Sequence, residues 1–227
     1  MDINILFTEN INEYKPSSKP TLFITSERAV ADFLTLRNEA VCIQIKNEED
    51  LSLFKEYHYF ITSDVPPMGH LEKIYCHIKN IPYVIGENEE LLIREECPDD
   101  MDIIYSMYED EECRRFLEPL PDYSSVDKEA RFESVKNGYL IYEYGMWIIE
   151  SKENHEVIGR AGFEYKDENT VSLGFMIKSG QRKKGYAYKA CLLCIKYLNE
   201  ILPEMKITAE CDASNIASLN LISKLNL

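Results

Sequence analysis

The sequence predicts an α/β (α+β) protein in which a small parallel sheet precedes a mixed, mostly antiparallel sheet flanked by helices. Strand-like and helix-like patterns alternate over residues 21–86, which is typical of a parallel sheet covered by helices. From residue 91 the pattern changes, and three strand-like segments joined by short turns follow one another within 146–178. We therefore expect an accessory domain over 1–90 and a second domain over 91–227.

The first part contains short runs rich in β-branched and aromatic residues, at 21–25, 41–45, 57–62 and 82–86. A helix-like segment after Ser26 and another ending before Pro82 separate these runs. No glycine-rich turn follows the first strand, which argues against a dinucleotide site. We predict an accessory or interaction domain and assign it no activity.

The second part begins with a strand over 91–96, an acidic helix over 97–120 and a second helix over 124–139. The antiparallel strands follow, and after them comes a helix whose apolar face starts at Ala187. A last strand is expected over 206–211, before a final helix.

The charge of the chain constrains its partners. The formal net charge is −15, and residues 86–135 hold 17 Asp or Glu against five Arg or Lys. Such a surface repels nucleic acid and anionic membranes, whereas it favours cationic partners. No apolar run approaches the roughly 20 residues that cross a bilayer, and the first residues are acidic, so we expect a cytoplasmic protein.

The seven cysteines lack the spacing of a disulfide framework. Cys191 and Cys194 form a CxxC, but it lies within a predicted helix without a second CxxC or a nearby His. We expect free thiols in a reducing compartment and no metal site.

The segment "KSGQRKKGYAYKA" concentrates positive charge at the start of the long helix. Free N–H groups around residues 183–187 and the helix dipole favour an anion, and Gly185 lets a ligand approach the main chain. The surrounding cations are Lys178, Arg182, Lys183, Lys184 and Lys189. A bound diphosphate and a merely solvated basic turn both fit this segment taken alone. A P-loop does not fit, because Tyr186 and Ala187 follow Gly185.

"RKKGYA" (182–187) matches the (Q/R)xxGx(G/A) signature of the GCN5-related N-acetyltransferases, the GNAT family, through Arg182, Gly185 and Ala187. Asn215 and Ser218 match the Asn-x-x-Ser pattern of the family's last shared helix. The resemblance covers residues 91–227 and looks closest to the ribosomal-protein N-terminal acetyltransferase subgroup.

The resemblance implies acetyl-CoA as co-substrate, with no metal. Its diphosphate would lie on the turn, and its pantetheine arm would run along strand 173–177 where this strand parts from 206–211. An N–H at Met176 or Ile177 would polarise the thioester carbonyl. The implied cofactor contacts are Phe175, Met176, Ile177, Arg182, Lys183, Lys184, Gly185, Tyr186, Ala187, Asn215 and Ser218.

The implied reaction is direct attack by a primary amine, either a peptide N-terminus or a small cationic amine. A carboxylate must first deprotonate this amine, and Glu164 and Glu210 are the candidates. Tyr142, Tyr144 and Trp147 either line the acceptor pocket or pack the sheet. A homodimer is left open, and neither nucleic acid nor a membrane is an expected partner.

Two departures from the family support an alternative function, a catalytically weak CoA-binding or protein-interaction module. Ile222 stands where many members carry the Tyr that protonates the leaving thiolate. Members usually continue through two more strands, whereas this sequence stops at Leu227, so we expect a truncated domain or one that another chain completes.

Overall fold

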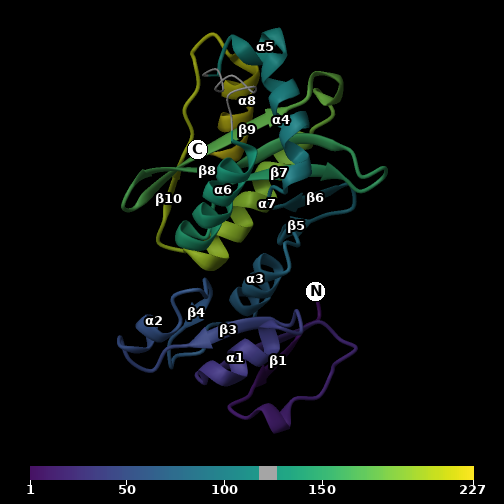
Figure 1. Ribbon diagram of the computed structural model, residues 1–227. Helices are drawn as coiled ribbons and strands as arrows, with labels where there is room; N and C mark the ends of the chain where they lie inside the picture. The colour runs from purple at the N-terminus through teal and green to yellow at the C-terminus, as the bar shows by residue number, and fades with distance from the viewer. Residues whose placement is uncertain (118–126) are drawn as a thin grey trace. The chain divides into compact units, whose positions relative to one another are not determined.

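The computed structural model describes residues 1–117 and 127–227, which form two compact units, Met1–Tyr83 and Val84–Leu227. Each unit is built on its own sheet (Figure 1). In the described ranges, no helix combines the length and the apolar character needed to cross a membrane.

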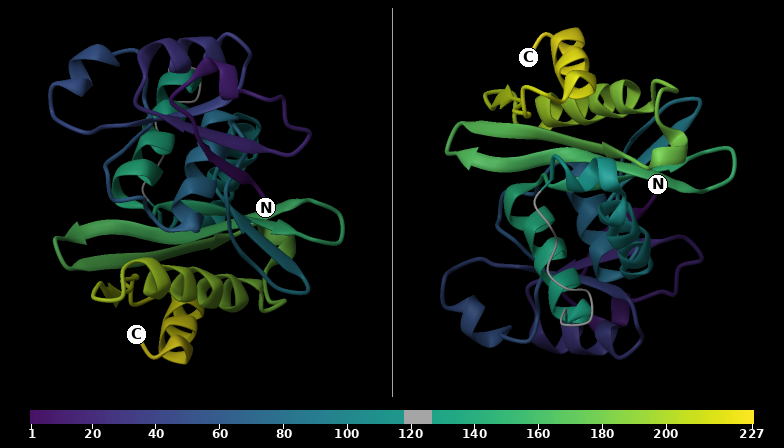
Figure 2. Two further views of the ribbon diagram at one scale, coloured as in Figure 1. Left: turned by 90° about the horizontal axis from the view of Figure 1, so that it is seen from below. Right: turned by 90° about the horizontal axis from the view of Figure 1, so that it is seen from above.

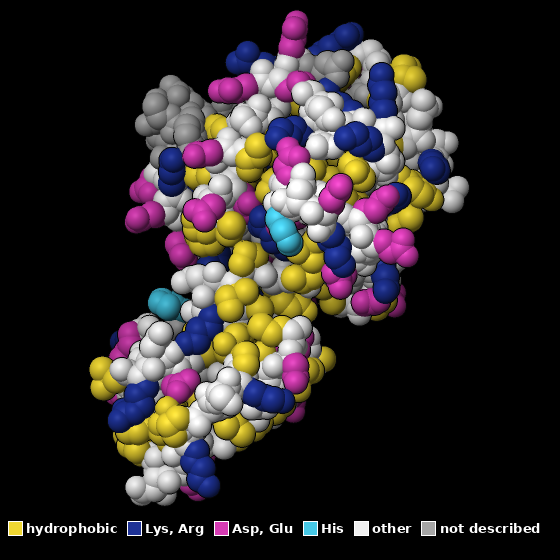
Figure 3. All heavy atoms as spheres, turned by 90° about the vertical axis from the view of Figure 1, so that its right-hand side faces the viewer, with side chains coloured by type: hydrophobic (Ala, Val, Ile, Leu, Met, Phe, Trp, Pro, Cys, Tyr) yellow, Lys and Arg dark blue, Asp and Glu magenta, His cyan; other side chains and the backbone are white. Residues whose placement is uncertain are grey.

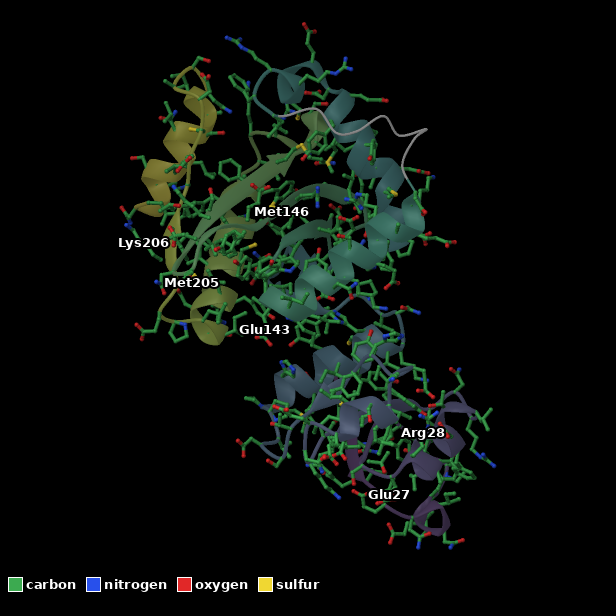
Figure 4. All side chains as sticks on the ribbon, turned by 60° about the vertical axis from the view of Figure 1, so that its left-hand side comes forward. Glu27, Arg28, Glu143, Met146, Met205 and Lys206 are labelled. Atoms are coloured by element: carbon green, nitrogen blue, oxygen red, sulfur yellow. The ribbon has the colours of Figure 1, made fainter. Side chains whose placement is uncertain are left out.

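The first unit is a four-stranded parallel sheet in the order β1-β2-β3-β4. Its strands are β1 (Asn4–Phe7), β2 (Thr21–Thr25), β3 (Ala40–Gln44) and β4 (Phe60–Ile61). Its helices are η1 (Ile11–Glu13), α1 (Arg28–Thr35), α2 (Asp50–Leu53) and α3 (Met68–Ile78), and Figure 4 labels Glu27 and Arg28 at the start of α1. One hydrophobic core contains residues of α1 and another residues of α3, so the buried strand β2 is covered on both faces. The predicted parallel sheet is confirmed.

The second unit contains a six-stranded sheet in the order β10-β9-β8-β7-β6-β5, in which only the β10–β9 pair is parallel. Its strands are β5 (Val84–Glu87), β6 (Leu91–Arg94), β7 (Met146–Ser151), β8 (Val157–Asp167), β9 (Thr170–Ile177) and β10 (Lys206–Thr208). Its helices are η2 (Pro98–Asp100), α4 (Met101–Glu109), α5 (Glu111–Arg114), α6 (Lys128–Tyr142), η4 (Ser179–Gln181), α7 (Tyr186–Ile201) and α8 (Ile216–Leu225). The predicted antiparallel meander is β7, β8 and β9.

The strand predicted at 82–86 does not join the parallel sheet. It is β5, which pairs antiparallel with β6 in the second unit. Asn88 causes this, because its side chain accepts hydrogen bonds from the N–H groups of Glu90 and Leu91 and so closes a tight turn between the two strands. The compact units accordingly divide after Tyr83, whereas the sequence suggested a boundary at residue 90.

The helix predicted over 97–120 is broken. Asp110 has extended backbone angles (φ −61°, ψ 129°) and separates α4 from α5. Its side chain accepts the Cys113 N–H at 3.1 Å, which makes it the N-cap of α5. The ends of this prediction at 118–120, and of the next helix at 124–126, lie outside the described residues.

Helices cover both faces of the larger sheet. Figure 2 shows α7 and α8 on one face, and α4 and α6 on the other. The side chain of Trp147 points to the sheet face that α7 covers. There its ring packs edge-on against Phe163 of β8 and Tyr197 of α7. The opposite face packs Ile148 and Met176 against Ile104 and Met107 of α4. This alternation decides which predicted site residues are accessible.

Candidate functional site

Strands β9 and β10 pair over only a short length. The register joins Lys206–Thr208 to Thr170–Ser172 and goes no further within the described residues. Figure 4 labels Met205 and Lys206 at the start of β10. Residues 173–177 of β9 therefore keep their pairing to β8 and lack a strand on the other side. This is the separation that the family resemblance implies.

The even-numbered residues of β9 direct their main-chain groups to β8. Just beyond the end of β9, the N–H of Lys178 donates to Ile158 O at 2.9 Å. Met176 lies two residues before Lys178 and is paired with Arg160 of β8. Because hydrogen-bonded pairs alternate along an antiparallel ladder, the N–H of Met176 also faces β8. Met176 is therefore not a main-chain donor to a ligand in the gap, contrary to the sequence prediction.

The odd-numbered residues face the side that β10 leaves open. Two contacts show this direction: Arg182 Nε donates to Ile177 O at 2.9 Å, and Thr208 Oγ1 donates to Val171 O at 3.1 Å. By the same alternation, the N–H groups of Phe175 and Ile177 point into the gap. These two positions offer the unpaired donors.

The turn between β9 and α7 presents a series of main-chain N–H groups. Gly185 caps α7 in the left-handed region (φ 83°), and Lys183 adopts the same region (φ 63°). Across the described ranges, no protein acceptor meets the N–H groups of residues 183–188. A Cβ built on Gly185 would have nothing within 4 Å. Uncapped amides beside open space at a helix N-terminus fit an anion such as a diphosphate.

The cations of this turn are partly neutralised. Lys178 Nζ lies 2.7 Å from Glu156, and Lys189 pairs with Glu90. Lys184 donates to the Gln181 amide at 2.7 Å, and Lys183 makes no ion pair within the described residues. On the face in Figure 3, acidic and basic side chains are likewise interspersed. The net positive charge therefore comes from Lys183 and Lys184 together with the helix N-terminus.

Arg182 binds the protein rather than projecting outward. Its Nη2 lies 3.0 Å from Asp110 Oδ1 and 3.0 Å from Cys113 Sγ. The hydrogen bond from Arg182 is the main cause that lowers the pKa of Asp110. The other signature residues, Lys183, Lys184, Gly185, Tyr186 and Ala187, lie on the turn and the first residues of α7.

The Asn-x-x-Ser pattern forms the start of α8. Asn215 is its N-cap, and its Oδ1 accepts the Ser218 N–H at 3.1 Å. This hydrogen bond explains the spacing of the two residues by helix capping.

The two candidate bases lie near the paired end of β9. Glu164 is exposed on β8 and pairs with Ser172, the last residue of β9 in register with β10. Glu210 lies beyond the end of β10 and forms an ion pair with Lys166 of β8. Glu210 thus already has a cationic partner.

The predicted acceptor wall is only partly accessible. Trp147 is 0% exposed, so the interpretation of this residue as a pocket wall is wrong. The pleat of β7 turns Trp147 toward α7, and Met146 to the opposite face, where its Sδ lies 3.3 Å from a Cβ built on Gly174 (Figure 4). Tyr144 is buried, and Tyr142 is 49% exposed beside Tyr144 and Tyr165, with ring centroids 5.9 and 6.2 Å away.

Two sets of ion pairs next to the site were not predicted from the sequence. Glu96 is buried and binds both Arg131 of α6 and Arg160 of β8, the latter at 3.1 Å. Asp110 was missed as well, although a cap of the form Asp-x-x before a new helical turn is a local signal that could have revealed it.

None of the seven cysteines, all of which lie in the described residues, forms a disulfide. Cys191 and Cys194 are buried in α7, and burial raises the pKa of Cys191 to about 12. The CxxC therefore packs the core of the second unit.

A protein-family model described as an acetyltransferase (GNAT) domain matches residues 90–227. Among curated proteins, YjdG of Bacillus subtilis strain 168, an uncharacterized N-acetyltransferase, is 33% identical over 84 residues. The matched segment makes up 36% of this chain and 50% of YjdG, so the chain spans about half the length of that relative.

Solved structures share the fold. A RimL ribosomal L7/L12 α-N-protein acetyltransferase aligns with a TM-score of 0.51 at 12% identity, covering 63% of this chain and 80% of that one. An acetyltransferase from Agrobacterium tumefaciens C58 gives 0.53 at 18% (62% and 81% covered). The ribosomal-protein-S5-alanine acetyltransferase from Vibrio fischeri gives 0.51 at 16% (62% and 80% covered). At these identities the likeness concerns the fold alone.

Proposed function

The chain belongs to the GNAT family of acetyltransferases, and on this premise we propose that it moves an acetyl group from acetyl-CoA to a primary amine. The observation that carries the proposal is the juxtaposition of two features. Uncapped N–H groups at the start of α7 adjoin the edge of β9 that β10 leaves open. The N–H groups at the start of α7 suit a diphosphate, and the open edge of β9 suits an extended chain that contains amides.

The residues that would hold CoA follow from this geometry. Lys183, Lys184 and the N–H groups of Gly185, Tyr186 and Ala187 would hold the diphosphate. Phe175 and Ile177 would bond the pantetheine amides or the thioester carbonyl, because their main-chain groups face the gap. Bound acetyl-CoA supplies an activated acyl group on a thiol that leaves readily, since a thiol has a pKa of about 8.5.

Glu164 is the favoured base for the amine. It is exposed and forms no ion pair within the described residues, whereas Glu210 is paired with Lys166. Ser172, its partner on β9, precedes Phe175 by three residues, which is roughly 10 Å along a strand. We therefore propose that Glu164 acts through water on an amine placed near the N–H of Phe175.

The acceptor is either a peptide N-terminus or a small cationic amine. Tyr142 and Tyr165 are exposed aromatic residues with ring centroids 6.2 Å apart, and they would contact the carbon chain of the acceptor. The fold likeness to ribosomal-protein acetyltransferases supports the peptide option, in line with the subgroup that the sequence resembles.

A CoA-binding module without transferase activity is the second candidate. The ion pair between Glu210 and Lys166 favours this candidate, because it leaves Glu164 as the one candidate base without an ion pair in the described residues.

The test combines calorimetric CoA binding with CoA release in the presence of peptides and small amines. We expect binding together with turnover on at least one amine, and Glu164→Gln should lower kcat by about 100-fold with CoA affinity retained. Glu168→Gln, in the exposed turn that follows β8, is the control and should leave kcat unchanged. Binding without turnover on any amine would support the module instead, and absence of CoA binding would refute both candidates.

A further inference from the structure

The side chain of Arg182 connects three separate elements. Its Nε binds the last carbonyl of β9, that of Ile177, at 2.9 Å. Its Nη2 reaches Asp110 Oδ1 and Cys113 Sγ, both at 3.0 Å, at the start of α5. The guanidinium thus joins the end of β9, the turn before α7 and the junction of α4 with α5.

Asp110 is well placed to orient this guanidinium. The side chains of Asp110 and Arg182 are each 24% exposed, so their ion pair is partly shielded from water. The same Oδ1 accepts the Cys113 N–H at 3.1 Å, which fixes the carboxylate on α5. Hydrogen bonds from Arg182 and from Cys113 N–H lower the pKa of Asp110, so the carboxylate is ionised at neutral pH.

The main chain immediately after Arg182 needs such an anchor. Arg182 is extended (φ −69°, ψ 163°), and the next residue, Lys183, has φ 63°, a conformation that residues other than Gly, Asn and Asp rarely adopt. In the described part of the chain, the N–H groups of residues 183–188 have no protein acceptor that would hold them in place. The direction of these amides therefore depends on how residue 182 is held.

We propose that Asp110 is a positioning residue for the diphosphate site and acts through Arg182. The ion pair holds the guanidinium against Ile177 O and so fixes the path of residues 182–185 between β9 and α7. Arg182 thus orients the turn and does not contact the anion, whereas Lys183, Lys184 and the free main-chain N–H groups do. This inference rests on the proposed function, because it assumes that CoA binds at this turn.

Asp110→Asn isolates the ion pair. Asparagine still accepts the Cys113 N–H, so the N-cap of α5 is retained and only the charge is lost. We expect the calorimetric Kd for CoA, and the KM for acetyl-CoA, to rise about 10-fold, while kcat at saturating acetyl-CoA stays within about two-fold. A variant that is merely less stable would instead lower the active fraction and hence kcat, with KM unchanged.

Asp127→Asn is the matched control. Asp127 caps α6 by accepting the Ala130 N–H at 3.1 Å, as Asp110 caps α5, but within the described residues it makes no hydrogen bond or ion pair with the turn at 182–187. Its Kd for CoA should equal that of the wild type. Arg182→Lys should weaken CoA binding at least as much as Asp110→Asn does, because it also removes the hydrogen bond from Nε to Ile177 O. The double variant should be no weaker than Arg182→Lys alone, because the ion pair with Asp110 is then already lost.

The outcomes separate this inference from the proposed function. If the wild type binds CoA and Asp110→Asn binds it equally well, Asp110 is not a positioning residue, while the CoA site remains. If the wild type does not bind CoA, the proposed function itself fails. Should the Asn variant not fold, Asp110→Ser decides, because serine also caps a helix but carries no charge to pair with Arg182. A raised Kd for CoA supports the inference, and a wild-type Kd overturns it.

Discussion

At the scale of single residues, Gly185 combines two properties that substitutions can separate. Its φ of 83° disfavours any side chain, and the space above its Cα is open. The first property concerns stability, because the left-handed region costs an L-residue about 1–2 kcal/mol. The second concerns binding, since a side chain would occupy the space through which an anion reaches the amides.

We therefore expect Gly185→Ala to lower both the free energy of unfolding, by about 1 kcal/mol, and the affinity for CoA. Gly185→Asn should recover most of the stability, because Asn tolerates the left-handed region, yet it should bind CoA no better than the Ala variant. Urea unfolding and calorimetry measure the two effects. Recovery of CoA affinity in the Asn variant would show that strain alone weakens binding.

Arg94 provides a second residue-scale test through pH. It binds buried Asp100 at 2.7 Å and Glu150 at 2.8 Å. Burial opposes ionisation of both carboxylates, but their hydrogen bonds to Arg94 outweigh it, so the pKa of Asp100 lies below 3.8 and that of Glu150 below 4.5. Carboxylates with a lowered folded pKa contribute stability above their unfolded pKa values, about 4, and lose it as the pH falls through the folded ones.

The unfolding free energy of the wild type should therefore fall between pH 5 and pH 3. In Arg94→Met, Asp100 loses its guanidinium partner and Glu150 keeps only its contact with His155 Nδ1, so the pKa values of both carboxylates rise and acidification from pH 7 to pH 5 should increase stability. Urea titrations over this range give the slopes, and Lys152→Met, which removes the exposed pair with Glu87, should keep the wild-type slope. Equal slopes in all three proteins would mean that Arg94 does not set these pKa values.

At the scale of elements, the contact of α6 with the sheet depends on Glu96. Its side chain is 1% exposed and binds Arg131 of α6 and Arg160 of β8. The Nε of Arg160 has no hydrogen-bond partner among the described residues. The buried charge of Arg160 is therefore compensated mainly by Glu96. Removing one partner of a buried ion pair costs about 3–5 kcal/mol, because the remaining charge is left uncompensated.

Glu96→Gln should thus destabilise the second unit by about 3 kcal/mol. Trp147 is the only tryptophan of the chain and lies in the core of this unit, so its fluorescence during urea unfolding reports on the second unit. Glu133→Gln changes an exposed carboxylate on the same helix, whose oxygen lies 4.0 Å from Lys136 Nζ, and should change stability by less than about 0.5 kcal/mol. A similarly small effect of Glu96→Gln would contradict the role of the buried pair.

The elements also show what the sequence could and could not predict. The start of α7 and the course of β9 follow from local periodicity, and both were predicted. The partner of Arg182 lies 72 residues away, and Glu96 and Arg160 are 64 apart. Charge pairing over such distances leaves no periodic pattern, so the residues that hold the turn and the sheet emerge only from the fold.

At the scale of the whole molecule, the two units have separate cores and separate sheets. Tyr83 belongs with the first unit through its ring over Lys73, at 5.7 Å. Val84 begins β5, an edge strand of the second sheet, in which Ile85 is buried and Gly86 faces Leu193 of α7. The division between residues 83 and 84 therefore separates two sets of packing contacts.

We predict that residues 84–227 fold without the first unit, and that residues 91–227, which start at the boundary the sequence suggested, are less stable. The shorter fragment loses the buried side chain of Ile85 and exposes the edge of β6, which should cost at least about 2 kcal/mol. Urea unfolding followed through Trp147 compares both fragments with the complete chain. Equal midpoints for the two fragments would show that β5 adds nothing to the second unit, and a midpoint of 84–227 far below that of the complete chain would show that this unit depends on residues 1–83.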